Sequence, residues 1–516
     1  MKTLFVSLLF LSFSMYTLAQ DGNLDDTFGV NGKVTTDIFG FTDVAHDLAY
    51  QSDGKMLVAG YSRSSVGNDN FLVVRYLENG DLDTSFGTNG YVNIDVRGFS
   101  SPKDDQATNV LIQSDNKIVL VGFSEGAFDV EQFTILRLNS DGSLDETYGD
   151  QGIRFFDFTG SYCEPADAVM LSNNNIAIAG STDTGSFNPS LIFAIAVIDE
   201  NGNLNQNFSI DGKQTLQFGA NYEEAYAITE TSDGSLLVGG DGANDFAVAK
   251  LSLNGNLDST FGNNGKIITD IPNYNGLGII GLHELSNGKI IAVGESSSSS
   301  ESRNVTLIRY NSDGSLDTTF ANNGFITIDI DSGSEDIPRS MFVQNDGKIL
   351  IAGSIVTGGE FYFLSLRFDT DGTLDSSYSG DGVRLESFNS NQIEIAYGIK
   401  QNDNGKINIV GYSGNTSGNT ADIAIAQYTG TSLNTSDYHE ALISFYPNPV
   451  QSQLFINSTQ AILNFSLYNL NGSLLKSKTV HNERDYKLDI SDLPQGVYHL
   501  KIKSDQGIIT KKVIKK

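Results

Sequence analysis

The chain has 516 residues and a formal net charge of −31, because 63 Asp and Glu face only 32 Lys and Arg. This excess of acid excludes nucleic acid as the expected partner, since binding to phosphates needs a basic face. Gly is abundant at 53 residues and Pro scarce at 8. Together with many Val, Ile, Thr, Phe and Tyr, this composition favours short strands joined by tight turns.

The first residues have the parts of a secretory signal peptide. Lys2 supplies a positive charge, the stretch from Leu4 to Phe13 is apolar, and the small residue Ala19 precedes an expected mature start at Gln20. The apolar stretch is too short to span a bilayer comfortably, and no other segment is apolar enough to do so. We therefore expect residues 1–19 to be a signal peptide, and no transmembrane segment in the mature chain.

The residue types that carry most enzyme chemistry are scarce. Cys163 is the single cysteine, which excludes an internal disulfide bond and is more typical of a small buried residue than of a nucleophile. The five His show no metal-ligand spacing, the sequence contains no His-Glu-x-x-His motif, and its glycines recur at turns with the period of the repeats. No catalytic residue is therefore predicted.

Most of the sequence consists of imperfect repeats. The string Leu24-Asp25-Asp26-Thr27-Phe28-Gly29-Val30-Asn31-Gly32 occurs seven times in varied form, and an aromatic residue always follows its leucine after four positions and a glycine after eight. The leucines are Leu24, Leu82, Leu144, Leu204, Leu257, Leu316 and Leu374. A second string, Lys55-Met56-Leu57-Val58-Ala59-Gly60, recurs with its glycine at Gly122, Gly180, Gly240, Gly294, Gly353 and Gly411. Turn sequences such as Asp-Gly before it are strong hairpin signals.

Each repeat contains four short strand patterns. In the first they lie near Ala45–Tyr50, Lys55–Ser62, Phe71–Leu77 and Tyr91–Asp95, and the third is apolar enough to be buried on both faces. Four-stranded sheets of this kind cover their faces by packing on copies of themselves. The last repeat has only three strand patterns, and we expect Lys33–Asp37 to supply its fourth strand and so close the ring.

These strings resemble the delta-60 repeat family. The resemblance covers residues 20–434 and implies a seven-bladed β-propeller of four-stranded blades. It implies no particular function, because propellers include enzymes, scaffolds and binding proteins.

A basic residue usually stands eight positions before the aspartate of the repeated motif. The pairs are Arg75 and Asp83, Arg137 and Asp145, Lys250 and Asp258, Arg309 and Asp317, and Arg367 and Asp375. In the copy that begins at Leu204 the two positions hold Val197 and Asn205, so both charges are absent together. Because a lone buried charge is costly, we interpret these residues as structural ion pairs. Asp25 is the exception, with no preceding strand to supply a cation.

Six of the seven units carry an acid two residues before their first strand. These acids are Asp43, Asp105, Glu164, Glu223, Asp336 and Glu394, and the fifth unit has Leu277. One interpretation is that each carboxylate caps backbone N–H groups at a turn of its blade. The other is an acidic ring at one mouth of the central channel that binds a cation or a basic ligand. A structural calcium ion there is the only cofactor that the sequence suggests.

The last part of the chain differs in charge and pattern. A polar linker is expected at 435–442, and from Ile443 to Lys516 ten Lys and Arg exceed five Asp and Glu. A local charge inversion supports a separate domain. Strand patterns near Gln453–Asn457, Asn464–Asn469, Tyr486–Ile490, Gly496–Lys503 and Ile508–Lys512 predict a small immunoglobulin-like β-sandwich.

Residues 443–516 resemble the C-terminal sorting domain of type IX secretion cargo. The resemblance depends on the motif Tyr446, Pro447, Asn448 and Pro449, on Leu467-Tyr468-Asn469-Leu470-Asn471-Gly472, on the segment that contains Gly496 and Tyr498, and on a basic end that contains Lys511 and Lys512. It implies export to the periplasm, transport across the outer membrane by the type IX machinery, and a secreted or surface-attached product.

Two functions remain open at this point. The first is a non-catalytic binding or scaffold protein outside the cell, whose ligand is a protein or a glycan. The second is an extracellular enzyme that acts on a polysaccharide or another polymer through paired carboxylates. An enzyme should place unlike polar residues together on one face, and the best candidates are the segments 162–165 and 221–226.

Overall fold

The computed structural model describes residues 21–516 except 66, 98–102, 127–129, 159, 161, 186–189, 221, 298–302, 390–391, 416–419, 431–442, 447–449, 470–473 and 505–506. The expected signal peptide and the linker at 435–442 lie outside these residues. The chain divides into two compact units, Met1–Thr431 and Ser432–Lys516.

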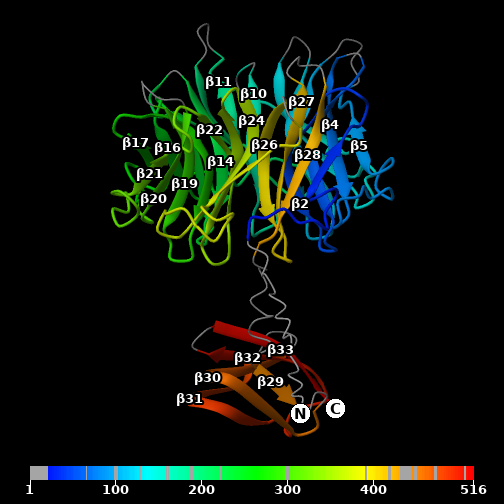
Figure 1. Cartoon of the computed structure of the whole chain (residues 1–516), viewed down its shortest axis with the longest axis vertical. Helices are drawn as coiled ribbons and strands as arrows, with labels where there is room; N and C mark the ends of the chain where they lie inside the picture. The colour runs from blue at the N-terminus through cyan, green and yellow to red at the C-terminus, as the bar shows by residue number, and fades with distance from the viewer. Residues whose placement is uncertain are drawn as a thin grey trace, which may run out of the picture. The chain divides into compact units, whose positions relative to one another are not determined.

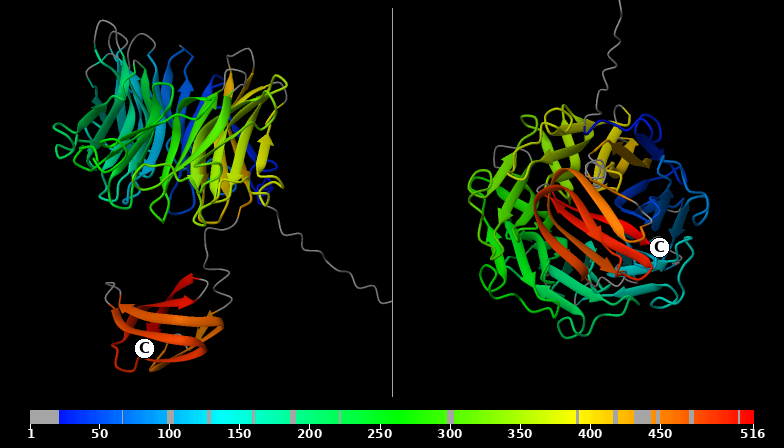
Figure 2. Two further views of the ribbon diagram at one scale, coloured as in Figure 1. Left: turned by 90° about the vertical axis from the view of Figure 1, so that its left-hand side faces the viewer. Right: turned by 90° about the horizontal axis from the view of Figure 1, so that it is seen from below.

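The first unit is a ring of seven antiparallel four-stranded sheets arranged around a central axis (Figures 1 and 2). We number the blades in chain order from the sheet β2–β5. The inner strands are β2 (Asp43–Tyr50), β6 (Asp105–Ile112), β10 (Cys163–Met170), β14 (Glu223–Glu230), β18 (Asn275–Glu284), β22 (Glu335–Val343) and β26 (Gln392–Gln401). The second strands are β3 (Met56–Arg63), β7 (Ile118–Glu125), β11 (Ile176–Asp183), β15 (Leu236–Gly242), β19 (Ile290–Ser297), β23 (Ile349–Thr357) and β27 (Ile407–Asn415).

The third strands are β4 (Asp69–Tyr76), β8 (Glu131–Leu138), β12 (Leu191–Ile198), β16 (Phe246–Leu251), β20 (Arg303–Tyr310), β24 (Glu360–Phe368) and β28 (Ala421–Tyr428). The outer strands are β5 (Tyr91–Ile94), β9 (Ile153–Phe156), β13 (Lys213–Leu216), β17 (Lys266–Thr269), β21 (Phe325–Ile328), β25 (Val383–Glu386) and β1 (Lys33–Thr36). This arrangement confirms the predicted seven-bladed propeller.

The two ends of the propeller meet in blade 7. β1 pairs with β28 in antiparallel register from Lys33 opposite Ala426 to Thr36 opposite Ile423. The prediction that the N-terminal segment supplies the missing strand is therefore confirmed. The pairing covers the edge of β28 and leaves only the four-residue β1 as the outer edge of blade 7, and short edge strands are one means by which proteins resist edge-to-edge association.

The hydrophobic core lies between neighbouring blades. Every residue of β4 is buried, as expected for a strand covered on both faces. The cluster around Phe28 combines residues of β2, β3 and β4 with Val410, Ile423 and Ile425 of blade 7, so the first and last blades share one core. The aromatic residue of each repeated motif fills this kind of space, as Phe86 does without any exposure. Neighbouring blades thus stabilise one another.

The second unit is a smaller sheet of five strands. Its strands are β29 (Ile443–Tyr446), β30 (Gln453–Asn469), β31 (Leu474–Asp489), β32 (Gly496–Ser504) and β33 (Gly507–Lys515). Two strands predicted separately from the sequence are the halves of β30, whose pairing with β31 is irregular between Asn457 and Asn464. The first half also pairs with β29 and the second with β32. Leu454 and Ile456 of the first half and Leu467 of the second are buried in the same core.

Candidate functional site

Each inner strand of the propeller contains a β-bulge that leaves one residue unpaired. In β2, for example, the register shifts between Ala45 and Asp47, so His46 has no partner on β3. The unpaired residues are His46, Thr108, Ala166, Tyr226, Ile280, Arg339 and Tyr397. All seven line one central cavity. Bulges redirect side chains, and here they direct one residue from every blade toward the cavity.

The glycine of the second repeated string is required by this bulge. A Cβ atom on Gly60 would lie 2.0 Å from the carbonyl oxygen of Val44, and one on Gly122 would lie 1.9 Å from that of Gln106. Such distances are far below van der Waals contact, so only glycine allows the inner strand to approach this closely. A motif that the sequence presented as a hairpin signal therefore also shapes the central cavity.

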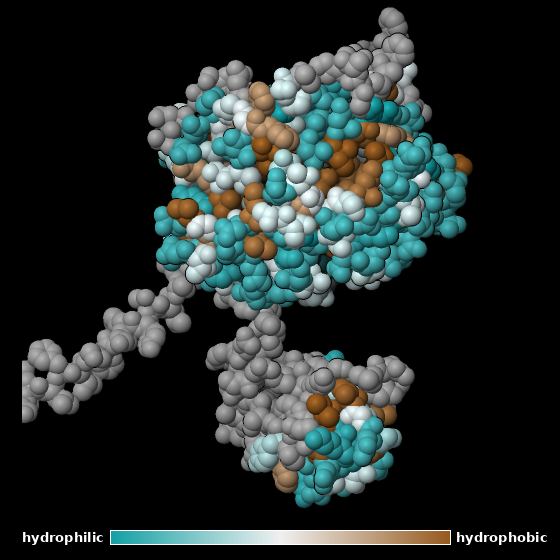
Figure 3. All heavy atoms as spheres, turned by 90° about the vertical axis from the view of Figure 1, so that its right-hand side faces the viewer, coloured by the Kyte–Doolittle hydropathy of each residue, from teal (hydrophilic) through white to brown (hydrophobic). Residues whose placement is uncertain are grey.

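The cavity has a volume of about 720 Å³ and is lined by residues of all seven inner strands. This volume is that of a site for a small molecule or a short chain segment, since ligand pockets usually measure about 300–1,000 Å³. Although the backbone around it repeats seven times, the seven bulge residues belong to six residue types that differ in size, charge and polarity. Hydrophilic residues predominate on the propeller face shown in Figure 3, with smaller apolar patches between them.

Blades 3 and 4 supply two tyrosine–carboxylate pairs to this cavity. The Tyr162 hydroxyl donates to Glu164 Oε2 at 2.5 Å, and the Tyr226 hydroxyl donates to Glu224 Oε2 at the same distance. Burial raises the pKa of Glu164, and the charge of Glu224 raises it further. From the two segments that the sequence suggested for an enzyme, Tyr162, Glu164 and Pro165 of the first thus line the same cavity as Glu224 and Tyr226 of the second, while Asn221 lies outside the described residues.

Another part of the wall is aromatic and basic. His46 and Tyr397 lie with their rings 4.9 Å apart, and the Arg339 guanidinium lies 5.3 Å from the centre of the Tyr397 ring. The His46 Nδ1 atom is 2.8 Å from the carbonyl oxygen of Ala107. Burial lowers the pKa of His46, so its ring is neutral at pH 7. Lys400 is paired with Asp47 at 3.2 Å, so Arg339 is the cation of this wall that remains directed at the aromatic face.

Two aspartates that follow the bulges link neighbouring blades. Asp47 Oδ2 accepts a hydrogen bond from the Val110 backbone N–H at 3.0 Å, and Asp167 Oδ2 accepts one from that of Ile228 at 2.8 Å. In each case the donor belongs to the inner strand of the next blade. Burial raises the pKa of Asp167 to about 6. These two aspartates were not predicted from the sequence. The signal that could have identified them is a repeat position that holds different residue types in different repeats.

Five of the six acids predicted as a ring hold the backbone between blades instead of lining the cavity. Asp43 accepts from the Ile38 N–H at 2.7 Å, and Asp105 accepts from that of Val96 at 2.9 Å. Glu223, Asp336 and Glu394 accept in the same way from Phe218, Ile330 and Phe388. Each donor lies two residues after an outer strand, so the carboxylate fixes the crossover to the next inner strand, as the capping interpretation describes.

Glu164 is a correction to the predicted set. The register places Pro165 opposite Gly180, where other blades place the alanine before the bulge, so the residue equivalent to Asp43 is Cys163. Cys163 Sγ accepts the equivalent hydrogen bond from the Phe158 N–H at 3.3 Å. Glu164 belongs one position later and faces the cavity, where Glu224 is its counterpart in blade 4. Because an acid stands directly after Cys163, the sequence prediction aligned this repeat with the others one residue too late.

The basic residues and aspartates of the repeated motif are in contact in all five predicted pairs. Nitrogen-to-oxygen distances are 2.9 Å for Arg75 and Asp83, 2.7 Å for Arg137 and Asp145, 3.5 Å for Lys250 and Asp258, 2.6 Å for Arg309 and Asp317, and 2.6 Å for Arg367 and Asp375. Three of the arginines also donate to a carbonyl oxygen of the next blade, as Arg75 does to Ser140 at 2.6 Å. The pairs therefore connect blades as well as strands.

A second cation supports several of these aspartates. Lys55 lies 3.3 Å from Asp83, and Lys117, Lys289 and Lys348 have the same place in later blades. Burial alone would raise the pKa of Asp83, but hydrogen bonds from Ser85 and the charges of Lys55 and Arg75 lower it to about 2. The lysine is the first residue of the second repeated string, which gives that position a physical role.

Asp25 is a second correction, because it does have a cation. The Asp25 N–H donates to the carbonyl oxygen of Gln427, just as the Asp83 N–H in blade 1 donates to that of Arg75. Gln427 therefore has the place that Arg75 has in blade 1. Gln427 carries no charge, and Lys406 Nζ instead lies 2.6 Å from Asp25 Oδ2. Where Asn205 replaces the aspartate in blade 3, its backbone partner is Val197.

The sorting motifs lie in the second unit. Tyr446 ends β29, Gly496 begins β32, and the Tyr498 hydroxyl donates to the Pro494 carbonyl oxygen at 2.6 Å. Lys511 and Lys512 are in β33. Pro447, Asn448 and Pro449 lie outside the described residues. No helix in the described part of the chain is long and apolar enough to cross a membrane.

Comparisons with known proteins identify both units. Residues 51–86, 113–148, 231–261, 285–320 and 344–378 match the family described as "Domain of unknown function (DUF5122) beta-propeller". Residues 444–516 match the family described as "Secretion system C-terminal sorting domain". The five propeller matches are in blades 1, 2, 4, 5 and 6, whereas blade 3 has the altered motif and blade 7 is split between the ends of the propeller.

Solved structures resemble the chain only distantly. Drosophila Semaphorin 1a (extracellular domains 1–2) is 10% identical, with 88% of this chain and 96% of that chain covered and a TM-score of 0.38. The Nup133 β-propeller domain of Vanderwaltozyma polyspora is 11% identical, with 77% and 100% covered and a TM-score of 0.35. A polysaccharide lyase, PL25-Ulvanlyase, is 10% identical, with 74% and 93% covered and a TM-score of 0.31.

No curated protein matches the chain in sequence. The family matches are therefore what identify it, and the sorting domain indicates export to the cell surface or the extracellular space. The chain carries repeats that match the DUF5122 β-propeller family, followed by a C-terminal sorting domain that indicates export by the type IX secretion system.

Proposed function

We propose that the propeller is an extracellular binding module and that its ligand enters the central cavity without being chemically changed. The observation that supports this most is the loss of repeat symmetry at the cavity. Residues that hold the blades together are alike from blade to blade, whereas the seven bulge residues differ. Because the fold itself does not require these differences, a ligand is the better explanation for them.

The chemistry of the wall favours a short glycan segment that carries no acidic group. Tyr162, Tyr226 and Tyr397 offer aromatic faces for the C–H groups of sugar rings, and Glu164 and Glu224 offer acceptors for hydroxyl groups. An anionic sugar is disfavoured, since Glu164 and Glu224 both line the cavity and the charge of Glu224 raises the pKa of Glu164. A cavity of about 720 Å³ is also too small for a folded protein.

A second candidate function is cleavage of such a glycan. It is favoured by one observation, the raised pKa of Glu164 beside Glu224. A protonated carboxyl group next to a second carboxylate is the pair that glycoside hydrolysis requires. Binding remains our first proposal because Glu164 and Glu224 are each held by a tyrosine two residues away in the sequence.

The test is a glycan array with the wild-type protein, followed by titration calorimetry with the best neutral or amino-substituted oligosaccharide. Glu224→Gln and Tyr162→Phe should each weaken binding by about tenfold or more, the loss expected for one buried hydrogen bond to a charged group. Glu78→Gln, which changes an exposed carboxylate in a turn, should leave binding unchanged. Equal affinity of all variants would contradict the proposal, and release of reducing ends would favour the enzyme.

A further inference from the structure

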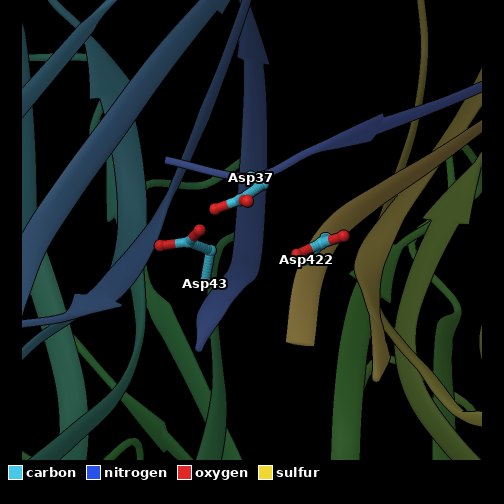
Figure 4. A group of neighbouring side chains, drawn as sticks. All are labelled: Asp37, Asp43 and Asp422. Carbon is cyan, nitrogen blue, oxygen red and sulfur yellow. The ribbon is translucent and has the colours of Figure 1, made fainter. Parts of the chain in front are cut away.

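Three aspartates meet where the ring closes. Asp37 follows β1, Asp422 is in β28 and Asp43 begins β2, and Figure 4 shows their carboxylates side by side. One oxygen atom from each lies within 4.8 Å of the others. The register of β1 and β28 has Thr36 opposite Ile423, so its next position places Asp37 opposite Asp422. Like charges in directly opposite positions destabilise a strand pair.

Asp43 gives an independent sign that something is missing between these groups. Its side chain is fully buried, and while Oδ2 accepts from the Ile38 N–H, Oδ1 has no hydrogen-bond partner among the residues that the structure describes. The Ser62 hydroxyl lies near this carboxylate and lowers its pKa, but burial and the charges of Asp37 and Asp422 outweigh it. A buried carboxylate oxygen without a partner is costly unless a cation is bound.

Basic side chains do not neutralise this cluster within the described part of the chain. No ion pair there joins a Lys or Arg to Asp37, Asp43 or Asp422. The three carboxylates therefore carry up to three negative charges in a small volume. Their neutralisation requires bound protons or a cation from solution.

The junction between blades 1 and 2 provides a comparison within the molecule. There Asp105 has the place of Asp43, Asp95 that of Asp37 and Asn70 that of Asp422, as the strand registers show. A neutral amide, Asn70, thus replaces the third acid, and its Nδ2 donates to Asn93 Oδ1 at 3.0 Å. The charge of Arg97 also favours ionised Asp105. The position equivalent to Arg97 at the ring closure is Phe39. Asp105 Oδ1, like Asp43 Oδ1, has no hydrogen-bond partner among the described residues, but of these two junctions only the closure combines three acids with no nearby cation of this kind.

We propose that Asp37, Asp43 and Asp422 bind one calcium ion, which joins the first strand of the chain to the last and first blades. Calcium prefers carboxylate oxygens at about 2.3–2.6 Å, and three oxygens within 4.8 Å of one another leave a point between them that is at most about 2.8 Å from each, close to this range. Water completes the coordination on the exposed side of Asp37. The small, strictly octahedral magnesium ion fits a cluster of flexible, unequally buried carboxylates less well.

The experiment is calorimetric titration of the whole protein, stripped with EDTA, with calcium chloride and then with magnesium chloride. We expect one calcium per chain with a dissociation constant of about 10⁻⁴ to 10⁻³ M, the range of extracellular calcium modules, and weaker binding of magnesium. Asp422→Asn converts the closure to the residue types of the next junction and should weaken calcium binding by at least about tenfold. Asp95→Asn, at that next junction, should leave calcium binding unchanged.

Thermal unfolding provides the second measurement. Calcium at 10 mM should raise the melting temperature of the wild type by a few degrees through mass action, and Asp422→Asn should lose this gain. In EDTA, Asp422→Asn should melt no lower than the wild type, because the substitution removes one of three like charges. If Asp422→Asn does not fold, Asp37→Asn, which changes an exposed residue, replaces it in both measurements. The proposal is overturned by an absence of calcium binding, by full affinity in Asp422→Asn, or by an equal loss in Asp95→Asn.

Discussion

Lys406 Nζ lies 2.6 Å from Asp25 Oδ2, so the last blade supplies a cation to a carboxylate from the first residues of the ring. The same segment donates through the Gly22 N–H to the Thr429 carbonyl oxygen, and β1 then completes the sheet. The N-terminal segment therefore contributes charge pairing, hydrogen bonds and a strand to blade 7.

Deletion of residues 21–37 should destabilise the whole propeller and not only blade 7. The deletion exposes the edge of β28 and removes Phe28 from the core shared by blades 7 and 1. We expect a fall in the melting temperature of at least about 10 °C, since a buried aromatic residue alone contributes about 3–5 kcal/mol. Differential scanning calorimetry of the deletion variant checks this, and an unchanged transition would show that the closure is dispensable.

The ion pairs of the motif should behave as coupled units. Arg309→Ala should lower the free energy of unfolding by about 1–3 kcal/mol, because it removes the bonds to Asp317 and to the Thr370 carbonyl oxygen. Adding Asp317→Asn should recover part of the loss. Denaturant unfolding of the two single variants and the double variant measures the coupling, and strictly additive effects would argue against it.

Lys250 provides the matched control for that series. It pairs with Asp233 at 3.0 Å and with Asp258 at 3.5 Å, both within its own repeat. Both aspartates are more exposed than Asp317, so Lys250→Ala should cost only about 0–1 kcal/mol. If Lys250→Ala lowered the free energy of unfolding as much as Arg309→Ala does, the hydrogen bond from Arg309 to the next blade would add nothing to stability.

Without calcium, the propeller should be more stable near pH 5 than near pH 7.5. Burial raises the pKa of Asp105 and of Asp43 to about 6, above the ordinary 3.8, so between these values the folded state binds more protons than the unfolded state. The free energy of unfolding therefore falls as the pH rises through this window. Below it, stability should also fall as Asp83, whose pKa is lowered to about 2, becomes protonated.

Urea midpoints measured in EDTA at pH 5 and pH 7.5 check this prediction. Asp105→Asn should reduce the difference between the two midpoints, since an amide does not titrate. A midpoint that is higher at pH 7.5 than at pH 5 would contradict the assignment of these buried carboxyl groups.

Cys163 should be unreactive while the protein is folded. Its side chain is fully buried, it accepts a hydrogen bond from the Phe158 N–H, and burial raises the pKa of its thiol. A chromogenic disulfide reagent should therefore label less than a tenth of the folded protein in the time that labels the unfolded protein completely. Rapid labelling under native conditions would show that blade 3 opens locally.

Removal of residues 444–516 should block secretion without unfolding the propeller. The sorting domain has its own strands and core, and the two compact units separate before it. The shortened protein should accumulate in the periplasm of a host with type IX secretion and should melt as the full chain does. Cell fractionation and thermal unfolding provide the two measurements, and normal secretion would contradict the role of the domain.

The repeats alone were sufficient to predict much of the fold. Seven copies of a leucine–aspartate motif and a glycine hairpin predicted seven four-stranded blades, and the missing strand of the last repeat predicted closure by Lys33–Asp37. These features depend on local turn chemistry and on hydrophobic alternation, which are properties of the sequence. The altered copy with Val197 and Asn205, which lacks both charges, likewise showed which two positions of the repeat form an ion pair.

Only the tertiary structure decided where the side chains of the inner strands point. Successive side chains of a strand point to opposite faces, and a bulge shifts this alternation by one residue. As a result, Glu164 faces the cavity while Cys163 has the place that an acid has in most blades. Closure of the ring likewise brings Asp25 to Lys406 and Asp37 to Asp422, residues nearly four hundred positions apart. Such contacts are set by the geometry of seven packed sheets. The glycine of the second repeated string recurs with the bulge but does not show where the side chains point, and the meeting of two chain ends leaves no periodic signal in the sequence.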